Sequence, residues 1–217
     1  MHQVLILVEG YTEERFVKTV LVPYLLDFQI NMIPTIITTK RVITGSNYKG
    51  GLLSFAQLER ELKLLFHSSN TILFTTFIDY YGLPTDFPGL DTAASDPYQR
   101  VKHVERELSE ALGDPRFLPF VMLHEFEAFC FVDPAEFMEC EEKASELAVA
   151  SLQASGPEKI NQQPATHPAQ RIESSFPSYD KVIDGVAIAE LIGVDKLRDA
   201  CPHFRKWLDQ VVGQAKA

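Results

Sequence analysis

Two short apolar runs, each ending at an acidic residue, set the strongest constraint on how this chain folds. Residues 3–8 read QVLILV and stop at Glu9, and residues 71–78 read TILFTTFI and stop at Asp79. Continuous apolar, β-branched runs of this length are typical of strands buried on both faces of a parallel sheet. Because the carboxyl ends of parallel strands meet at one rim, the pattern predicts that the two acids lie close together.

The segments after each run indicate further helices and strands. Thr12 is predicted to cap a helix with apolar residues at helical spacing. A second strand is predicted near residues 32–37, a Gly- and Lys-rich loop over 39–51, and a helix over 53–66. Each apolar run is therefore followed by a helical pattern, as parallel crossovers require.

The rest of the chain predicts the domain organisation. A helix is expected over 98–112 and a strand over 117–123, after which the pattern becomes helical with a Pro-rich connector. We expect an α/β fold, with a Rossmann-like, mostly parallel sheet of about four strands flanked by helices. The predicted α/β domain spans 1–133, and a helical C-terminal extension spans 134–217.

Composition limits the classes of protein that the chain can belong to. Hydrophobic residues make up 46% of the 217 residues, enough for a sizeable core. With 30 Asp and Glu against 20 Lys and Arg, the net charge of −10 opposes the attraction by which most nucleic-acid binders approach phosphate. The three cysteines show no CxxC spacing, so neither a disulfide framework nor a zinc knuckle is predicted.

The sequence also indicates a location for the protein. No stretch approaches the eighteen or so uninterrupted apolar residues of a membrane span. Glu9 interrupts the first apolar run too early for a secretory signal peptide. We therefore expect a cytoplasmic protein that does not contact a membrane.

Three predicted strands end in acids, at Glu9, Asp79 and Glu125. Carboxylate oxygens are the ligands that Mg²⁺ prefers, and clustered carboxylates repel one another without a cation. The arrangement predicts a site for Mg²⁺, or Mn²⁺, that orients a phosphate and activates water. The alternative is that each acid caps a helix or forms a surface ion pair.

The segment HEFE at 124–127 leaves two assignments open. It lacks the second His, four residues after His124, that zinc proteases require. Either Glu125 or Glu127 can supply a metal ligand, depending on where the strand becomes helix. His124 is a candidate for proton transfer or phosphate contact, against the alternative of a structural hydrogen-bonding residue.

Residues near these acids supply candidate substrate contacts. Lys40, Arg41 and Lys49 are candidates for binding phosphate, or are simply part of a solvated loop. Tyr80 and Tyr81 directly follow Asp79. Their rings are candidates for stacking on nucleic-acid bases, or they simply pack against the fold.

Several motifs together resemble a known family. The chain resembles the bacterial domain-of-unknown-function family 4276, which is grouped with Toprim-like nucleases. The resemblance covers nearly the whole chain and is carried by these segments: VEGYTEERF, FIDYYGLPTDFPG, HEFEAFCFVDP, EKINQQPATHPAQRI, SYDK and GVDKLRDACPHFRKWL.

The resemblance implies specific roles for residues. The Toprim glutamate falls on Glu9, and the first aspartate of the Asp-x-Asp motif falls on Asp79. The second aspartate position holds Tyr81. Toprim nucleases of the overcoming-lysogenisation type use an acid from a later segment, and by analogy Glu125 or Glu127 would supply it here.

The resemblance also implies a function. It favours a Mg²⁺-dependent nuclease that hydrolyses phosphodiester bonds, in DNA more than RNA, with Glu9, Asp79, Glu125 and His124 as its catalytic residues. An ATPase partner subunit in a bacterial defence or DNA-processing system is expected. The alternative is a catalytically silent subunit that regulates the ATPase, and both Tyr81 and the acidic charge favour it.

Overall fold

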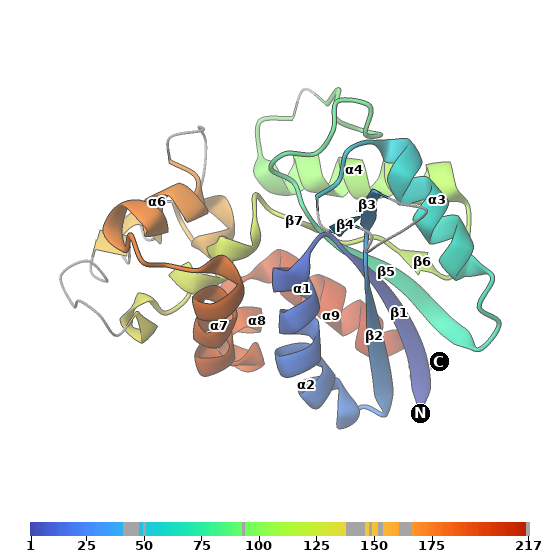
Figure 1. Cartoon of the computed structure of the whole chain (residues 1–217), viewed down its shortest axis with the longest axis horizontal. Helices are drawn as coiled ribbons and strands as arrows, with labels where there is room; N and C mark the ends of the chain where they lie inside the picture. The colour runs from blue at the N-terminus through green and yellow to red at the C-terminus, as the bar shows by residue number, and fades with distance from the viewer. Residues whose placement is uncertain are drawn as a thin grey trace.

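The computed structural model describes residues 1–40, 48–49, 51–92, 94–137, 146–147, 149–151, 154–160 and 166–215, and describes no side chains for 38–40, 48 and 49. Its centre is a parallel sheet (Figure 1). The strands, in spatial order, are β2 (Ile30–Ile36), β1 (His2–Val8), β5 (Thr71–Asp79) and β6 (Phe117–Leu118), and β7 (Val121–Met122) also pairs with β5. Each of these pairs is parallel, as the apolar runs predicted.

Helices cover both faces of the sheet (Figure 1). On one face lie α3 (Phe55–Phe66) and α4 (Pro97–Leu112). The other face is covered first by a continuous helical segment, which comprises α1 (Tyr11–Phe16), the π-helical turn η1 (Val17–Leu21) and α2 (Val22–Leu26).

The C-terminal part is helical, as predicted. After η2 (Phe126–Phe131), which lies inside the predicted α/β domain, the C-terminal elements are η3 (Pro134–Glu136), η4 (Pro157–Lys159), α6 (Pro168–Ser175), η5 (Lys181–Gly185), α7 (Val186–Ile192), α8 (Val194–Ala200) and α9 (Pro202–Gln214). These elements lie together on one side of the sheet (Figure 1).

The side chains of β1 alternate between two hydrophobic clusters. Val4, Ile6 and Val8 belong to the cluster shared with α1, η1 and the C-terminal helices. Leu5 and Leu7 belong to the cluster shared with α3 and α4. Because β1 is buried on both faces, it has no polar face, and this explains its uninterrupted apolar sequence.

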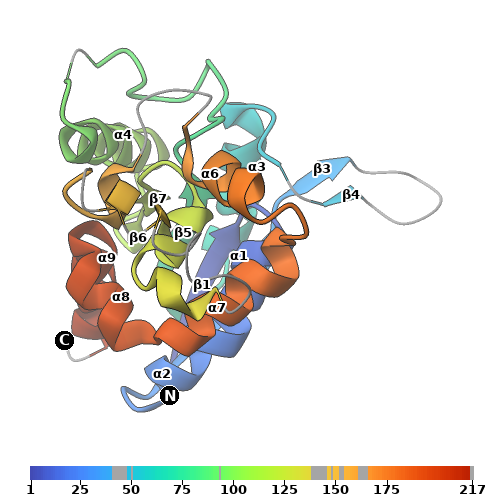
Figure 2. The ribbon, with the colours of Figure 1, turned by 90° about the vertical axis from the view of Figure 1, so that its left-hand side faces the viewer.

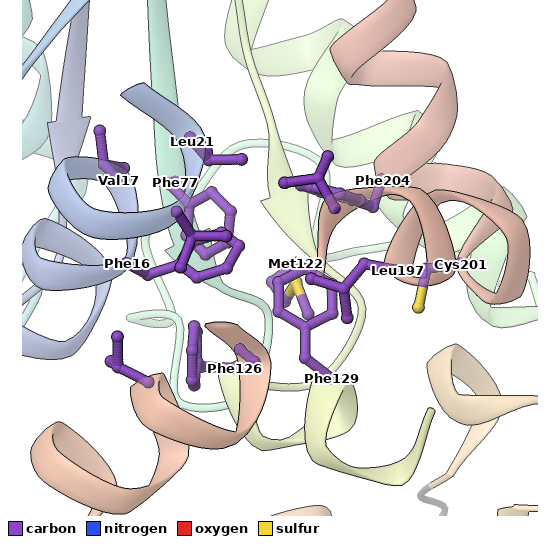
Figure 3. Close-up of a cluster of buried hydrophobic side chains, with 14 of the residues drawn as sticks. Phe16, Val17, Leu21, Phe77, Met122, Phe126, Phe129, Leu197, Cys201 and Phe204 are labelled. Atoms are coloured by element: carbon purple, nitrogen blue, oxygen red, sulfur yellow. The ribbon is translucent and has the colours of Figure 1, made fainter. Parts of the chain in front are cut away.

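Aromatic rings join the sheet to the C-terminal helices (Figure 3). Phe16 on α1 lies 5.3 Å from Phe126, and Phe129 lies 4.9 Å from Phe204 on α9, measured between ring centroids. The indole nitrogen of Trp207 donates to Thr75 Oγ1 on β5 at 2.9 Å. The first hydrophobic cluster therefore contains residues from both sides of residue 133, and the predicted division there stays a prediction.

Three local predictions differ from the structure. Helix α1 begins after Gly10, so Thr12 lies inside the helix, and the Glu13 carboxylate accepts the Gly10 N–H instead. The predicted strand over 117–123 is divided into β6 and β7. The predicted loop over 39–51 contains two short antiparallel strands, β3 (Thr38–Lys40) and β4 (Tyr48–Lys49), which project from the rest of the chain (Figure 2).

The predicted α/β architecture with a helical C-terminal part is confirmed. Among the residues that the structure describes, no helix is long and apolar enough to cross a membrane.

Candidate functional site

Glu9 and Asp79 lie side by side at the carboxyl ends of neighbouring strands. Glu9 follows β1 directly, and Asp79 is the last residue of β5. The Glu9 N–H donates to Phe77 O at 3.3 Å, which continues the pairing of the two strands. The Glu9 carboxylate turns back and accepts the Asp79 N–H at 3.2 Å through Oε2. Parallel pairing thus brings together two acids that are 70 residues apart.

A lysine from the C-terminal part joins this rim. Lys181, the first residue of η5, places Nζ 3.4 Å from Asp79 Oδ2 and 3.1 Å from Glu127 Oε2. The side chains of Asp79 and Glu127 are buried, whereas 36% of the Lys181 side chain remains exposed. The ammonium group therefore lies between two buried acids and keeps access to solvent.

Glu13 adds a fourth carboxyl group. It lies in the first turn of α1, is only 3% exposed, and accepts the Gly10 N–H at 2.8 Å through Oε2. Its charge raises the pKa values of both Glu9 and Asp79. We call Glu9, Glu13, Asp79, Glu127 and Lys181 the strand-end site.

Burial perturbs the proton affinities of this site. Burial raises the pKa of Asp79 well above its ordinary value of 3.8, and it also raises the pKa of Glu9. It raises the pKa of Glu127 to about 7. Burial opposes the charge of Lys181, but the neighbouring charges of Asp79 and Glu127 outweigh this and raise its pKa. The site holds more acid than its lysine can neutralise.

Among the residues that the structure describes, two buried carboxylate oxygens have no hydrogen-bond partner, Asp79 Oδ1 and Glu127 Oε2. The second lies at ion-pair distance from Lys181, but without hydrogen-bond geometry. A buried oxygen of this kind costs free energy unless a proton, a cation or a ligand donor meets it. The unpaired Asp79 Oδ1 therefore marks Asp79 as a group with unused binding capacity, whereas Glu127 Oε2 already faces the Lys181 ammonium.

The two glutamates of the HEFE segment face different surroundings. Glu125 Oε1 lies 2.9 Å from His167 Nδ1 and accepts the Ala169 N–H at 2.7 Å, so it holds the start of α6. Glu127 instead contacts Lys181. The geometry favours Glu127 over Glu125 as the third acid beside Glu9 and Asp79, and the metal role of either residue stays a prediction.

His124 is buried between strand and helix in an unusual conformation. Its backbone has φ of 71°, in the left-handed region, and its Nε2 has no hydrogen-bond partner. Burial and the charge of Arg100 lower its pKa to about 4, so the imidazole is neutral at pH 7. Its predicted catalytic role stays a prediction.

The predicted substrate contacts are located only in part. Arg41 lies outside the described residues, and Lys40 and Lys49 are described only as backbone in β3 and β4. The two tyrosines differ from each other. The guanidinium carbon of Arg100 lies over the Tyr80 ring, 5.8 Å from the ring centroid. Tyr81 is 44% exposed.

Sequence reasoning missed two members of the strand-end site, Glu13 and Lys181. Glu13 stands within VEGYTEERF and Lys181 ends SYDK, both of which carried the family resemblance. A charged residue inside a family motif was the available signal in both cases.

The oxygen donors of the strand-end site are of the kind that the predicted divalent metal prefers. Carboxylate oxygens suit Mg²⁺ or Mn²⁺, and the unpaired Asp79 Oδ1 next to Glu9 is consistent with a cation. In the described part of the chain, no three Asp, Glu, His or Cys side chains are arranged as metal ligands. The carboxylates of Glu9 and Asp79 therefore suit such an ion in their chemistry, and their role as its ligands stays a prediction.

The fold and site define a class of protein: an α/β protein whose parallel strands end in a buried acidic site. The chain belongs to the family described as Domain of unknown function (DUF4276), whose model matches residues 8–212. No curated protein matches the chain significantly.

Two solved structures are similar to the chain at low sequence identity. The C-terminal region of the Burkholderia pseudomallei OLD protein is 14% identical, with a TM-score of 0.44 over 98% of this chain and 99% of that chain. The C-terminal region of the Xanthomonas campestris pv. campestris OLD protein is 16% identical, with a TM-score of 0.41 over 98% and 95%.

Proposed function

We propose that this protein is a Toprim-like phosphodiesterase that cleaves nucleic acid with the help of Mg²⁺ or Mn²⁺. The observation that carries the proposal is the pairing of Glu9 with Asp79 at adjacent strand ends, with Asp79 Oδ1 buried and unpaired. Strand ends of this kind are where α/β proteins bind ligands, and strongly perturbed carboxyl groups concentrate at functional sites.

The residues of the strand-end site take different roles in this proposal. Glu9 and Asp79 would hold the metal, which would supply Lewis-acid chemistry toward the phosphate when bound. Lys181 is partly exposed and close to Asp79, so it contacts a non-bridging phosphate oxygen and stabilises the charge that develops there. Glu127 holds Lys181 in place. Glu13 holds the first turn of α1 in place by accepting the Gly10 N–H.

The test is metal-dependent cleavage of single-stranded and duplex DNA and RNA by the purified full chain. Glu9→Gln and Asp79→Asn are each expected to lower cleavage at least 100-fold, since removal of one preorganised charge-stabilising group commonly costs about that much. Glu59→Gln, a partly exposed acid on α3 paired with Lys63, is the matched control and retains wild-type cleavage. Wild-type cleavage by either Glu9→Gln or Asp79→Asn overturns the proposal.

A second function has an observation in its favour. Lys181 already bridges Asp79 and Glu127, and such a bridge also serves a purely structural ion-pair network. The protein would then be a catalytically silent subunit that regulates an ATPase partner. Copurification with an ATPase, together with no cleavage and no heat of Mn²⁺ binding by the complex, supports this function over the enzyme.

A further inference from the structure

Tyr81 and His167 form a stacked aromatic pair beside the strand-end site. Their ring centroids lie 4.8 Å apart with an interplanar angle of 20°. His167 covers one face of the tyrosine ring, yet 44% of Tyr81 remains exposed. An exposed aromatic ring with one face already covered leaves its other surface available to a ligand.

The pair is held rigidly from both sides. The Tyr81 N–H donates to His124 O at 2.7 Å, which fixes the backbone two residues beyond Asp79. His167 Nδ1 lies 2.9 Å from Glu125 Oε1, and the same oxygen accepts the Ala169 N–H at the start of α6. The rings are therefore preorganised, and a ligand that stacks on them meets little cost in lost side-chain freedom.

The net charge of −10 restricts which ligands can gain affinity here. Long-range attraction to phosphate is weak for such a protein, so contacts that do not depend on charge must contribute more. Stacking of a base on an aromatic ring is one such contact, and it is open only to bases that are not paired within a duplex.

We propose that Tyr81, supported by His167, is a stacking site for an unpaired nucleobase, which makes single-stranded nucleic acid the ligand class of this protein. The inference deepens the proposed function and rests on it, since it places the base next to a phosphate bound at the strand-end site. It also gives a role to the residue at the second aspartate position of the Toprim motif. A tyrosine there supplies base contact in place of a carboxylate.

The test measures binding rather than cleavage, so that it is independent of turnover. A single-stranded oligonucleotide of about ten nucleotides, carrying 2-aminopurine, is titrated with the full chain in metal-free buffer, and the quenching of its fluorescence reports stacking. Wild-type protein is expected to quench the probe and to bind it about 10-fold more tightly than a duplex of the same sequence.

Three variants separate stacking from general effects on the fold. Tyr81→Leu is expected to weaken binding about 10-fold and to abolish quenching, whereas Tyr81→Phe stays within about twofold of wild type because it keeps the ring. Leu64→Ala, which removes an exposed apolar side chain on α3, is the surface control and binds as wild type. Thermal unfolding midpoints verify that all three are folded.

Each outcome decides the inference. Wild-type binding by Tyr81→Leu, equal affinity for duplex and single strand, or no binding of either overturns it. Tyr81-dependent binding by a protein that cleaves nothing supports the stacking site while it contradicts the proposed hydrolysis. Cleavage that requires Asp79, combined with nucleic-acid binding that is unaffected by Tyr81→Leu, supports the proposed hydrolysis and contradicts the stacking site.

Discussion

Two acidic groups in the described part of the chain differ sharply in their hydrogen bonding. In the strand-end site, Asp79 Oδ1 and Glu127 Oε2 have no hydrogen-bond partner. In a second group, which we call the helix-cap network and which comprises Tyr98, Glu105, Glu158 and His203, every acid is engaged. Glu158 Oε1 accepts the Phe204 N–H, and its Oε2 accepts the His203 N–H and the Tyr98 hydroxyl.

The helix-cap network has a structural explanation. The N–H groups that Glu158 binds belong to the first turn of α9, where they have no partner within the helix. A carboxylate at that end is also favoured by the helix dipole. Glu105 Oε1 accepts the Val121 N–H and lies 2.9 Å from His203 Nε2, so it too is matched by donors.

The comparison teaches how to separate structural acids from functional ones. Both groups are buried, and burial raises the pKa of Glu158 as it does that of Asp79. Burial alone therefore does not distinguish them. What differs is that both Glu158 oxygens accept from protein donors, whereas the strand-end site keeps the unpaired Asp79 Oδ1, which a ligand can use.

The largest expected effect is a change in pH dependence at Glu127. Its pKa is raised from 4.5 to about 7, so the folded state binds this proton more tightly than the unfolded state. Wild-type stability from this group is highest below about pH 4.5 and is lost as the pH rises to about 7. We expect Glu127→Gln to gain about 3 kcal/mol in unfolding free energy relative to wild type between pH 4.5 and 7.5.

Urea unfolding of both proteins at the two pH values measures this difference. The control is Leu64→Ala, which removes an exposed apolar side chain and no titrating group, and so should leave the pH dependence parallel to that of wild type. If the unfolding free energy of Glu127→Gln depends on pH in the same way as that of wild type, the pKa of Glu127 is not raised in the folded protein. The comparison between the two acidic groups then fails at Glu127.

The second effect is a loss of stability in the helix-cap network. Glu158→Ala leaves two helix N–H groups and a tyrosine hydroxyl without their acceptor, and we expect it to lower the unfolding free energy by about 2 kcal/mol. Asp79→Asn is the matched change in the strand-end site. It should cost less than Glu158→Ala, because burial raises the pKa of Asp79 and so disfavours the carboxylate charge that the substitution removes. The unfolding free energies of both variants are measured by urea unfolding at pH 7.5. Equal losses in Glu158→Ala and Asp79→Asn contradict the distinction between a structural Glu158 and a functional Asp79.

The smallest effect is stabilisation by metal. Mg²⁺ at about ten times its dissociation constant is expected to raise the unfolding free energy of wild type by about 1.4 kcal/mol, seen as a shift of a few degrees in the thermal midpoint. The same shift should persist in Glu158→Ala and disappear in Asp79→Asn. A shift that survives in Asp79→Asn places the metal somewhere other than the strand-end site.

Part of the site was predictable because its residues lie at the ends of strands. The runs before Glu9 and Asp79 are apolar since β1 and β5 are buried on both faces, and parallel pairing then fixes where both acids fall. Lys181 reaches Asp79 across 102 positions of sequence, and no local pattern encodes such a contact. The sequence therefore predicted that Glu9 and Asp79 lie together at the rim of the sheet, but it did not predict that Lys181 joins them.

The choice between Glu125 and Glu127 depended on the residue at which η2 begins, and sequence patterns do not locate a helix start to within one residue. Both follow β7, and η2 is a 3₁₀-helix that begins immediately after Glu125. Glu125 is consequently the residue before the helix and reaches α6, while Glu127 turns toward Lys181. An error of one or two residues in the predicted strand end exchanges the two roles.

The packing of α9 against the central strand has a consequence for biosynthesis. Trp207 and Phe204 cover Phe77 and Phe120, so the sheet obtains its cover from a segment about 130 positions downstream of β5. A nascent chain that has emerged only as far as residue 133 exposes these rings to water and to other chains. Chaperones that bind exposed aromatic segments would therefore meet this protein before its translation is finished.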